Sequence, residues 1–96
     1  MSQIFTNPSF FDACTWNNEG IALFNTGHYA EALRAYDKAL ELDPDYSSAW
    51  FNKSTALDEL ERYEEAMRAF DKALELNPEE ALQALKKAPE LDMKPK

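Results

Sequence analysis

The chain has very little cysteine, histidine and glycine, and this scarcity excludes several kinds of site. Its 96 residues include one cysteine, Cys14, so no internal disulfide can form and nothing calls for an oxidising compartment. The single histidine, His28, has no second ligand-type residue at helical or zinc-finger spacing, whereas a metal site needs three or four ligands. Gly20 and Gly27 are the only glycines, so a glycine-rich phosphate loop is absent. We therefore expect neither a metal nor a cofactor.

Long apolar segments and a catalytic constellation are also lacking. No stretch approaches the roughly 20 apolar residues of a membrane span, and the N-terminal MSQIFTNPSFF lacks the basic segment and apolar run of a signal peptide. We expect a cytoplasmic protein without membrane contact. Cys14 has no assignable base or orienting acid and is interpreted as a packed, inert thiol. The carboxylates are interpreted as a solvated face with local pairs such as Glu64 with Arg68, so no enzyme activity is expected.

Basic residues are scarce beside acidic ones. The chain has 10 Lys and Arg against 18 Asp and Glu, a net charge of −8. Residues 1–46 sum to −5, residues 47–80 to −5 and residues 81–96 to +2. Such an acidic body repels phosphate backbones, which excludes nucleic acid as the expected partner. A basic or polar peptide fits the charge better, although acidity that only maintains solubility explains it equally well.

The chain does contain an internal repeat with a period of 34 residues. Ala13–Tyr46 aligns with Ser47–Glu80 without a gap, with identity at 16 of 34 positions. The identities cluster in the similar segments Tyr29–Leu42 and Tyr63–Leu76. A fixed period of this length, with aromatic, small and proline positions kept, indicates a repeat architecture built from one supersecondary unit.

These positions resemble the tetratricopeptide repeat, a helix–turn–helix unit that stacks into a solenoid. The resemblance covers Ala13–Glu80 and implies an all-α fold. It departs from the family at Glu19 and Lys53, where leucine is usual. The matching positions are Trp16/Trp50, Gly20/Ser54, Leu23/Leu57, Ala32/Ala66, Tyr36/Phe70, Ala39/Ala73 and Pro44/Pro78.

Proline and glycine predict where the helices begin and end. An Asn or Asp directly before proline occurs at Asn7, Asp43 and Asn77, and each pair predicts an N-cap followed by the first helical residue. Glu80 completes a capping-box pattern with Asn77. Gly27 fits a left-handed C-terminal position, which Glu61-Arg62 replaces less favourably in the second repeat. About five helices are expected, over residues 8–26, 29–42, 44–60, 62–76 and 78–88.

The expected organisation is one short solenoid. Residues 1–12 form an extension that lengthens the first helix and places Phe10 and Phe11 in its extra turn. Residues 13–46 and 47–80 are the two repeats. Residues 81–88 complete a capping helix, and residues 89–96 are a flexible tail. In the capping helix, Ala81, Leu82, Ala84, Leu85 and Ala88 are expected to cover the apolar flank of the preceding helix.

Small residues predict close packing within each repeat. Ala32 and Ala66, opposite Gly20 and Ser54, leave room for two helices to approach closely. The second helix of each repeat has an apolar face with 3–4 spacing. These faces are Ala32, Leu33, Tyr36, Ala39 and Leu40 in the first repeat, and Ala66, Met67, Phe70, Ala73 and Leu74 in the second.

The resemblance also implies where a partner binds, because in this family the first helices of the repeats line a concave face that holds peptides. Amide side chains there offer the donor and the acceptor that a peptide backbone needs. Phe24 and Phe51 fit ordinary core packing equally well. The expected peptide-binding residues are Asn17, Asn18, Ile21, Phe24, Asn25, Phe51, Asn52, Thr55, Asp58 and Glu59.

The predicted function is that of a non-catalytic scaffold or adaptor that binds a protein or peptide. A family subclass clamps acidic carboxyl termini, but Asn17 and Ile21 replace its expected basic residue and asparagine, so only Asn52 fits and this reading is disfavoured. Two alternatives remain. One is a structural element that self-associates through open solenoid ends, for example a homodimer through Phe10, Phe11 and the first helix. The other is a fragment excised from a longer array.

Overall fold

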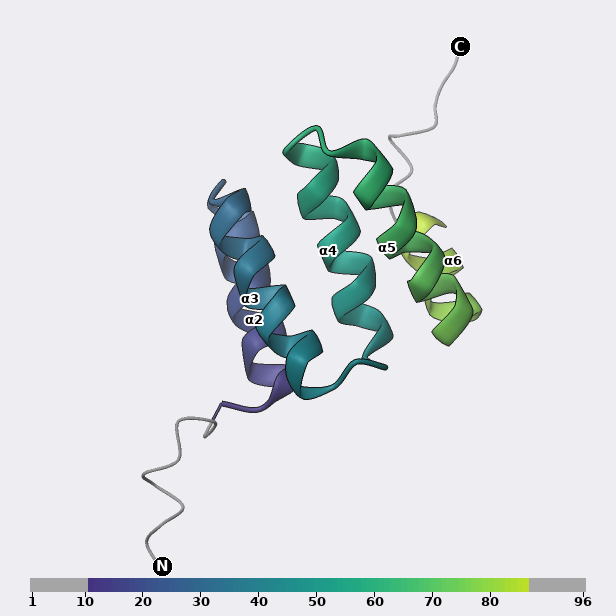
Figure 1. Ribbon diagram of the computed structural model, residues 1–96, viewed down its shortest axis with the longest axis horizontal. Helices are drawn as coiled ribbons and strands as arrows, with labels where there is room; N and C mark the ends of the chain where they lie inside the picture. Colours follow the sequence, from purple (N-terminus) through teal and green to yellow (C-terminus); the bar gives the residue numbers. More distant parts are fainter. Residues whose placement is uncertain (1–10, 87–96) are drawn as a thin grey trace, which may run out of the picture.

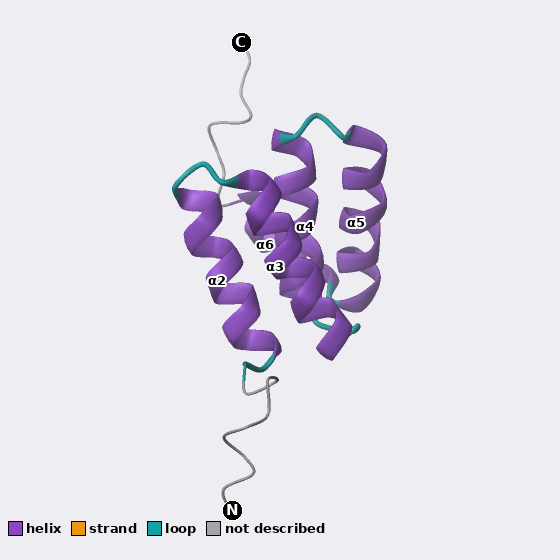
Figure 2. Cartoon of the chain, turned by 60° about the vertical axis from the view of Figure 1, so that its left-hand side comes forward, coloured by secondary structure: helices purple, strands orange, loops and turns teal. Residues whose placement is uncertain are grey.

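The described part of the chain, residues 11–86 of a computed structural model, is all helical. Figure 1 shows α4 lying between α3 and α5, and Figure 2 shows helices joined by short loops, with no strand in this part of the chain. The all-α prediction is confirmed. The five helices within residues 11–86 are α2 (Ala13–Asn25), α3 (Tyr29–Leu42), α4 (Ser47–Glu59), α5 (Tyr63–Leu76) and α6 (Pro78–Lys86).

Helix α2 begins later than its predicted start at residue 8. Asp12 has extended backbone, and its carboxylate accepts the N–H of Thr15 at 2.9 Å, so it is the N-cap. Phe11 precedes the helix and packs edge-on against Trp16, with ring centroids 5.2 Å apart. The prediction that Phe11 belongs to an extra turn is wrong, because Asp12 caps the helix after it. Residues 7, 8 and 10 lie outside the described part.

Helix α4 also begins later than predicted, at Ser47 rather than Pro44. Asp43 does not cap it, since the Asp43 carboxylate accepts the N–H of Asp45 at 3.2 Å within a turn. The indole Nε1 of Trp50 donates to the carbonyl of Pro44 at 2.7 Å and so occupies an acceptor that a helix starting there would use. The residue 34 positions after Trp50 is Ala84, which has no side-chain donor to bind a carbonyl in this way near the start of the next helix.

Helix α6 begins as predicted, with Asn77 at the N-cap and Pro78 first. The Asn77 side chain accepts the N–H of Glu80 at 3.1 Å. The reciprocal half of the expected capping box is not made, because the Asn77 N–H bonds to the carbonyl of Ala73 at 2.9 Å. The Glu80 carboxylate instead contacts the Asn77 side chain, whose Nδ2 donates to Oε1 of Glu80 at 3.4 Å. Residues 87–96, including the predicted tail and Ala88, lie outside the described part, as do the side chains of residues 84–86, including Ala84 and Leu85.

The predicted close packing is present where small residues face large ones. A Cβ added to Gly20 would lie 2.4 Å from Cε1 of Tyr36, so the glycine is needed for the ring to fit. Ala32, Ser54 and Ala66 are buried, as expected. The approach of α2 to α3 therefore depends on the absence of one side chain.

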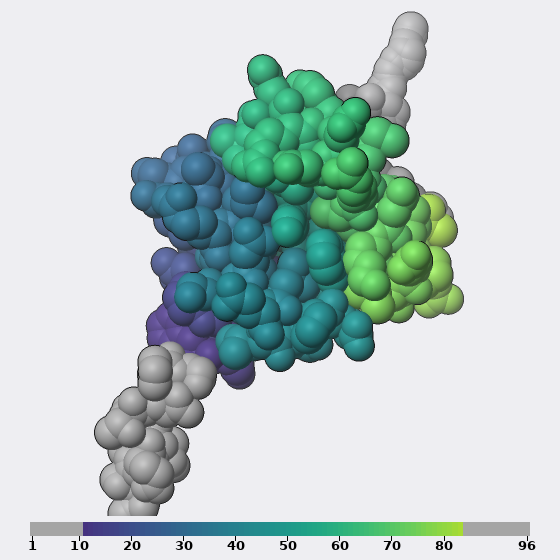
Figure 3. Space-filling view, viewed as in Figure 1, coloured from purple at the N-terminus to yellow at the C-terminus, as the bar shows by residue number. Residues whose placement is uncertain are grey.

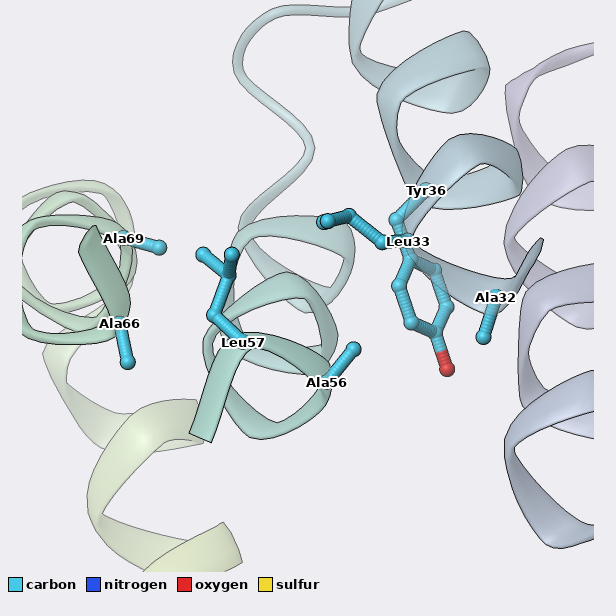
Figure 4. Close-up of a cluster of buried hydrophobic side chains, with 7 residues drawn as sticks. All are labelled: Ala32, Leu33, Tyr36, Ala56, Leu57, Ala66 and Ala69. Atoms are coloured by element: carbon cyan, nitrogen blue, oxygen red, sulfur yellow. The ribbon is translucent and has the colours of Figure 1, made fainter. Parts of the chain in front are cut away.

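The core lies on both sides of α4. Figure 4 shows Leu57 of α4 between Leu33 of α3 and the alanines Ala66 and Ala69 of α5. A second cluster joins Ala39, Leu40 and Ala49, with both tryptophans packed against it. Helix α4 thus contributes to both core clusters.

The outer side of α5 is less buried than the apolar pattern predicts. The apolar face of α3 is buried at all five positions, but Met67 of α5 is 66% exposed and Leu82 of α6 is 51% exposed. The expected cover of Met67 by Leu82 is wrong. Helix α6 packs instead through the buried Ala81. On α5 the buried residue is Ala69, which faces α4, rather than Met67.

Candidate functional site

A cavity of about 290 Å³ lies on the face formed by α2, α4 and α6, called here the α2–α4–α6 face. Four of the ten residues predicted to bind a peptide line it, namely Asn17, Ile21, Phe51 and Asn52. Asn17 and Ile21 lie four residues apart on α2. On α4, Phe51 and Asn52 come three and four residues after Ser48, which also lines the cavity, so each set shares one side of its helix. The structure therefore brings together the central part of the predicted set.

The two asparagines in this cavity have different environments. Asn17 is only 4% exposed, and its side-chain oxygen accepts a hydrogen bond from Nδ2 of Asn52 at 3.0 Å. Because Asn17 is buried, it fixes the orientation of Asn52 rather than facing solvent itself. Asn52 is half-buried and keeps a carbonyl oxygen and one N–H beyond this bond. Those are the groups that a peptide backbone pairs with.

The two phenylalanines, for which the sequence left two readings, lie in different places. Phe24 packs against the core cluster and against Tyr29, with ring centroids 4.9 Å apart, and does not line the cavity. Phe51 is half-buried, contacts Phe70 at 5.8 Å between centroids and forms part of the cavity wall. Ile21, which is 37% exposed, adds an apolar surface opposite.

The remaining predicted residues lie outside the cavity. Thr55 is half-buried and donates its hydroxyl to the carbonyl of Asn52 at 2.7 Å. Asn18 contacts the sulfur of Cys14 at 3.7 Å, and Cys14 is exposed, so its interpretation as a packed thiol is wrong. The other three, Asn25, Asp58 and Glu59, are exposed.

The acidic group of this cavity was not among the residues predicted from the sequence. Glu80 of α6 lines it together with Ser48 and Gln83. The Ser47 hydroxyl donates to Oε1 of Glu80 at 2.5 Å, and the Ser48 hydroxyl donates to Oε2. These two hydrogen bonds lower the pKa of the Glu80 carboxyl and keep it ionised. The capping-box pattern marked Glu80, but only tertiary packing places it beside α4.

Among the side chains that the structure describes, those of residues 11–83, no cation neutralises the Glu80 charge. The ion pairs there are Lys53–Asp37, Arg62–Glu65 and Lys72–Glu75, and none includes Glu80. Two serine hydroxyls solvate the carboxylate but carry no charge themselves. The cavity therefore combines a negative charge, an oriented amide and two apolar side chains.

His28 and the carboxylates do not assemble a metal centre in residues 11–86. The ring Nδ1 of His28 lies 2.8 Å from the hydroxyl of Thr26 in the loop between α2 and α3. No group of three or more His, Cys, Asp or Glu side chains suited to a metal ion occurs among the described residues. None of the described helices is both long and apolar enough to cross a bilayer.

Comparison with known protein families gives a match. Residues 17–81 match the family model described as a tetratricopeptide repeat, a range that holds most of α2, all of α3, α4 and α5, and the start of α6. The search of curated proteins found no match. The matched range includes six of the seven cavity-lining residues.

Proposed function

The chain belongs to the tetratricopeptide repeat family, and from this premise we propose that it is a non-catalytic scaffold that binds a basic or polar peptide on the α2–α4–α6 face. Members of this family generally serve as protein-interaction scaffolds. The proposal takes residues 13–46 and 47–80 as the two repeats and places the protein in the cytoplasm.

The observation that carries this proposal is the ionised Glu80 in a cavity with Asn52 and Phe51. A lysine or arginine side chain supplies the missing positive charge, and charge-assisted hydrogen bonds are the stronger kind. Asn52 offers a donor and an acceptor to the peptide backbone, and Phe51 with Ile21 offers apolar contact. The predicted residues Asn18, Asn25, Asp58 and Glu59 supply a polar rim in this proposal.

The experiment uses a positional-scanning library of short peptides, read by fluorescence anisotropy on the full chain. We expect arginine or lysine to be selected at one position. In Glu80→Gln the amide still accepts a serine hydroxyl but lacks the charge, so the affinity for the selected peptide should fall about tenfold.

The matched control is Glu79→Gln, which changes the net charge equally one residue away, at an exposed position outside the cavity. It should leave the affinity within about twofold. NMR shift changes on peptide addition should centre on Asn52 and Phe51. Selection of no basic residue, or equal losses in the two variants, would contradict the proposed face.

A further inference from the structure

A second cavity, of about 420 Å³, lies between α3 and α5 with α4 at its base, and is called here the α3–α5 groove. In Figure 3 the blue atoms of α3 and the green atoms of α5 lie on either side of teal atoms of α4. On α4, Trp50, Lys53 and Leu57 face this groove. At 100° per residue, these positions are centred roughly 180° from those facing the other cavity. The two cavities therefore lie on opposite sides of α4.

Positive charge is concentrated in this groove. Residues 1–80 contain six Lys and Arg, and four of them line it, namely Lys53, Arg62, Arg68 and Lys72. The same residues contain sixteen Asp and Glu, of which only Asp37 and Glu65 line it. The groove thus has the opposite sign to the rest of the acidic body. If this surface only faced solvent and bound no partner, nothing would favour gathering the basic side chains in one groove.

The groove carboxylates neutralise only part of this charge. Lys53 pairs with Asp37 at 2.8 Å, and Arg62 pairs with Glu65 at 2.7 Å. Among the described residues Arg68 makes no ion pair, and the pair expected with Glu64 is not formed.

Lys72 has only a distant partner, since its ammonium lies 3.7 Å from the carboxylate of Glu75. Surface pairs of this kind contribute little and are exchanged easily. Arg68 and Lys72 occur four residues apart on α5, so they form one edge of the groove.

The floor of the groove is apolar and packed against the core. Leu33, Leu57 and Ala69 belong to the core cluster, and Trp50 packs against it. The Trp50 ring is held by the bond from its Nε1 to Pro44, and the Lys53 ammonium lies 5.2 Å from the ring centroid. This floor offers contact to one apolar side chain, while the edge offers donors to carboxylates.

We propose that the α3–α5 groove binds a short acidic peptide segment, with an apolar side chain on the floor and carboxylates on Arg68 and Lys72. Arginine and lysine recognise carboxylates by charge-assisted hydrogen bonds. A long polyanion such as nucleic acid is disfavoured, because it would run over the acidic surface around the groove. This site is separate from the α2–α4–α6 face in position and in the charge that it selects.

The test uses a fluorescein-labelled glutamate-rich peptide containing one leucine, with its glutamine counterpart and a single-stranded oligonucleotide of equal charge as comparisons. The full chain should bind the glutamate peptide and bind both comparisons at least about tenfold more weakly. On binding, the indole NMR signal of Trp50 should shift and that of Trp16, which does not line the groove, should not.

The repeat itself supplies a matched control. Arg34 and Lys38 occupy on α3 the positions of Arg68 and Lys72 on α5, one period earlier, and they are exposed outside the groove. The double variant R68Q/K72Q should weaken acidic-peptide binding about tenfold, and R34Q/K38Q should change it less than about twofold. Glu80→Gln should leave acidic-peptide binding unchanged, which separates this test from that of the proposed function.

Several outcomes would overturn the proposal. Equal losses in the two double variants would mean diffuse attraction, and equal binding of the oligonucleotide would mean a nonspecific anion surface. Absence of acidic-peptide binding up to about 1 mM, a free energy of about −4 kcal/mol, would mean that the groove is unoccupied by this class of ligand. Concentration-dependent light scattering that R68Q/K72Q abolishes and R34Q/K38Q does not would assign the groove to a second copy of the chain.

Discussion

At the scale of single residues, Gly20 shows how one missing side chain permits helix contact. Helix propensity alone predicts that Gly20→Ala stabilises α2 by about 1 kcal/mol. The added Cβ would lie 2.4 Å from the buried Tyr36 ring, so we expect a net destabilisation of about 1–2 kcal/mol in urea unfolding. At exposed Ala22 on the same helix, substitution by glycine should also destabilise, by about 1 kcal/mol. A more stable Gly20→Ala would contradict the packing described.

Tyr36 provides a second residue-scale prediction, concerning alkaline pH. It is 1% exposed, no hydrogen bond to its hydroxyl occurs among the described residues, and burial raises its pKa to about 12. The unfolded chain loses this proton near pH 10 and the folded chain does not, so stability should fall between pH 10 and about 12.

Tyr36→Phe, which copies Phe70 of the second repeat, should reduce this alkaline loss of stability by up to about 1.4 kcal/mol per pH unit. At pH 7 it should be neutral or stabilising, because no hydrogen bond within the described part is lost. Urea unfolding at several pH values measures both effects. A marked destabilisation at pH 7 would show that the hydroxyl has a partner.

At the scale of the elements, the two loops that follow α2 and α4 share one left-handed position but place different residues there. Gly27 has φ of 84° and the equivalent Glu61 has φ of 65°, a left-handed conformation that costs a residue with a Cβ about 1 kcal/mol. Glu61→Gly should therefore raise the free energy of unfolding by about 0.5–1 kcal/mol, and Gly27→Ala should lower it by a similar amount. Thermal melts check both. Changes of the same sign would contradict this account.

At the scale of the whole molecule, stability is a sum over neighbouring helices, as in other stacked repeats. A chain ending at Asn77 loses the buried Ala81 and the hydrogen bonds from Ser47 and Ser48 to Glu80. We expect a loss of about 2 kcal/mol and a melting temperature lower by about 10 °C. Hydrogen exchange should accelerate in α4 and α5 more than in α2. A uniform acceleration would mean that the helices unfold together.

The sequence by itself determined the all-α fold and the helices α3 and α5, because a gapless 34-residue repeat combines with apolar 3–4 spacing. It also identified Gly27 as left-handed and Gly20 as a close contact. These features follow from local backbone preference and side-chain size, which are properties of the residues themselves. Four cavity residues, including Asn52 and Phe51, could be predicted because they lie on predictable helix faces.

Only the tertiary structure decided which groups from different helices meet. The indole of Trp50 holds the Pro44 carbonyl, and this moves the start of α4 to Ser47. Asn17 of α2 is buried and accepts a hydrogen bond from Asn52 of α4, and Glu80 of α6 accepts hydrogen bonds from the serines of α4. The distances between helices depend on how side chains fill the space between them, and that packing is a property of several segments at once. The sequence pattern of a single helix therefore cannot predict this packing.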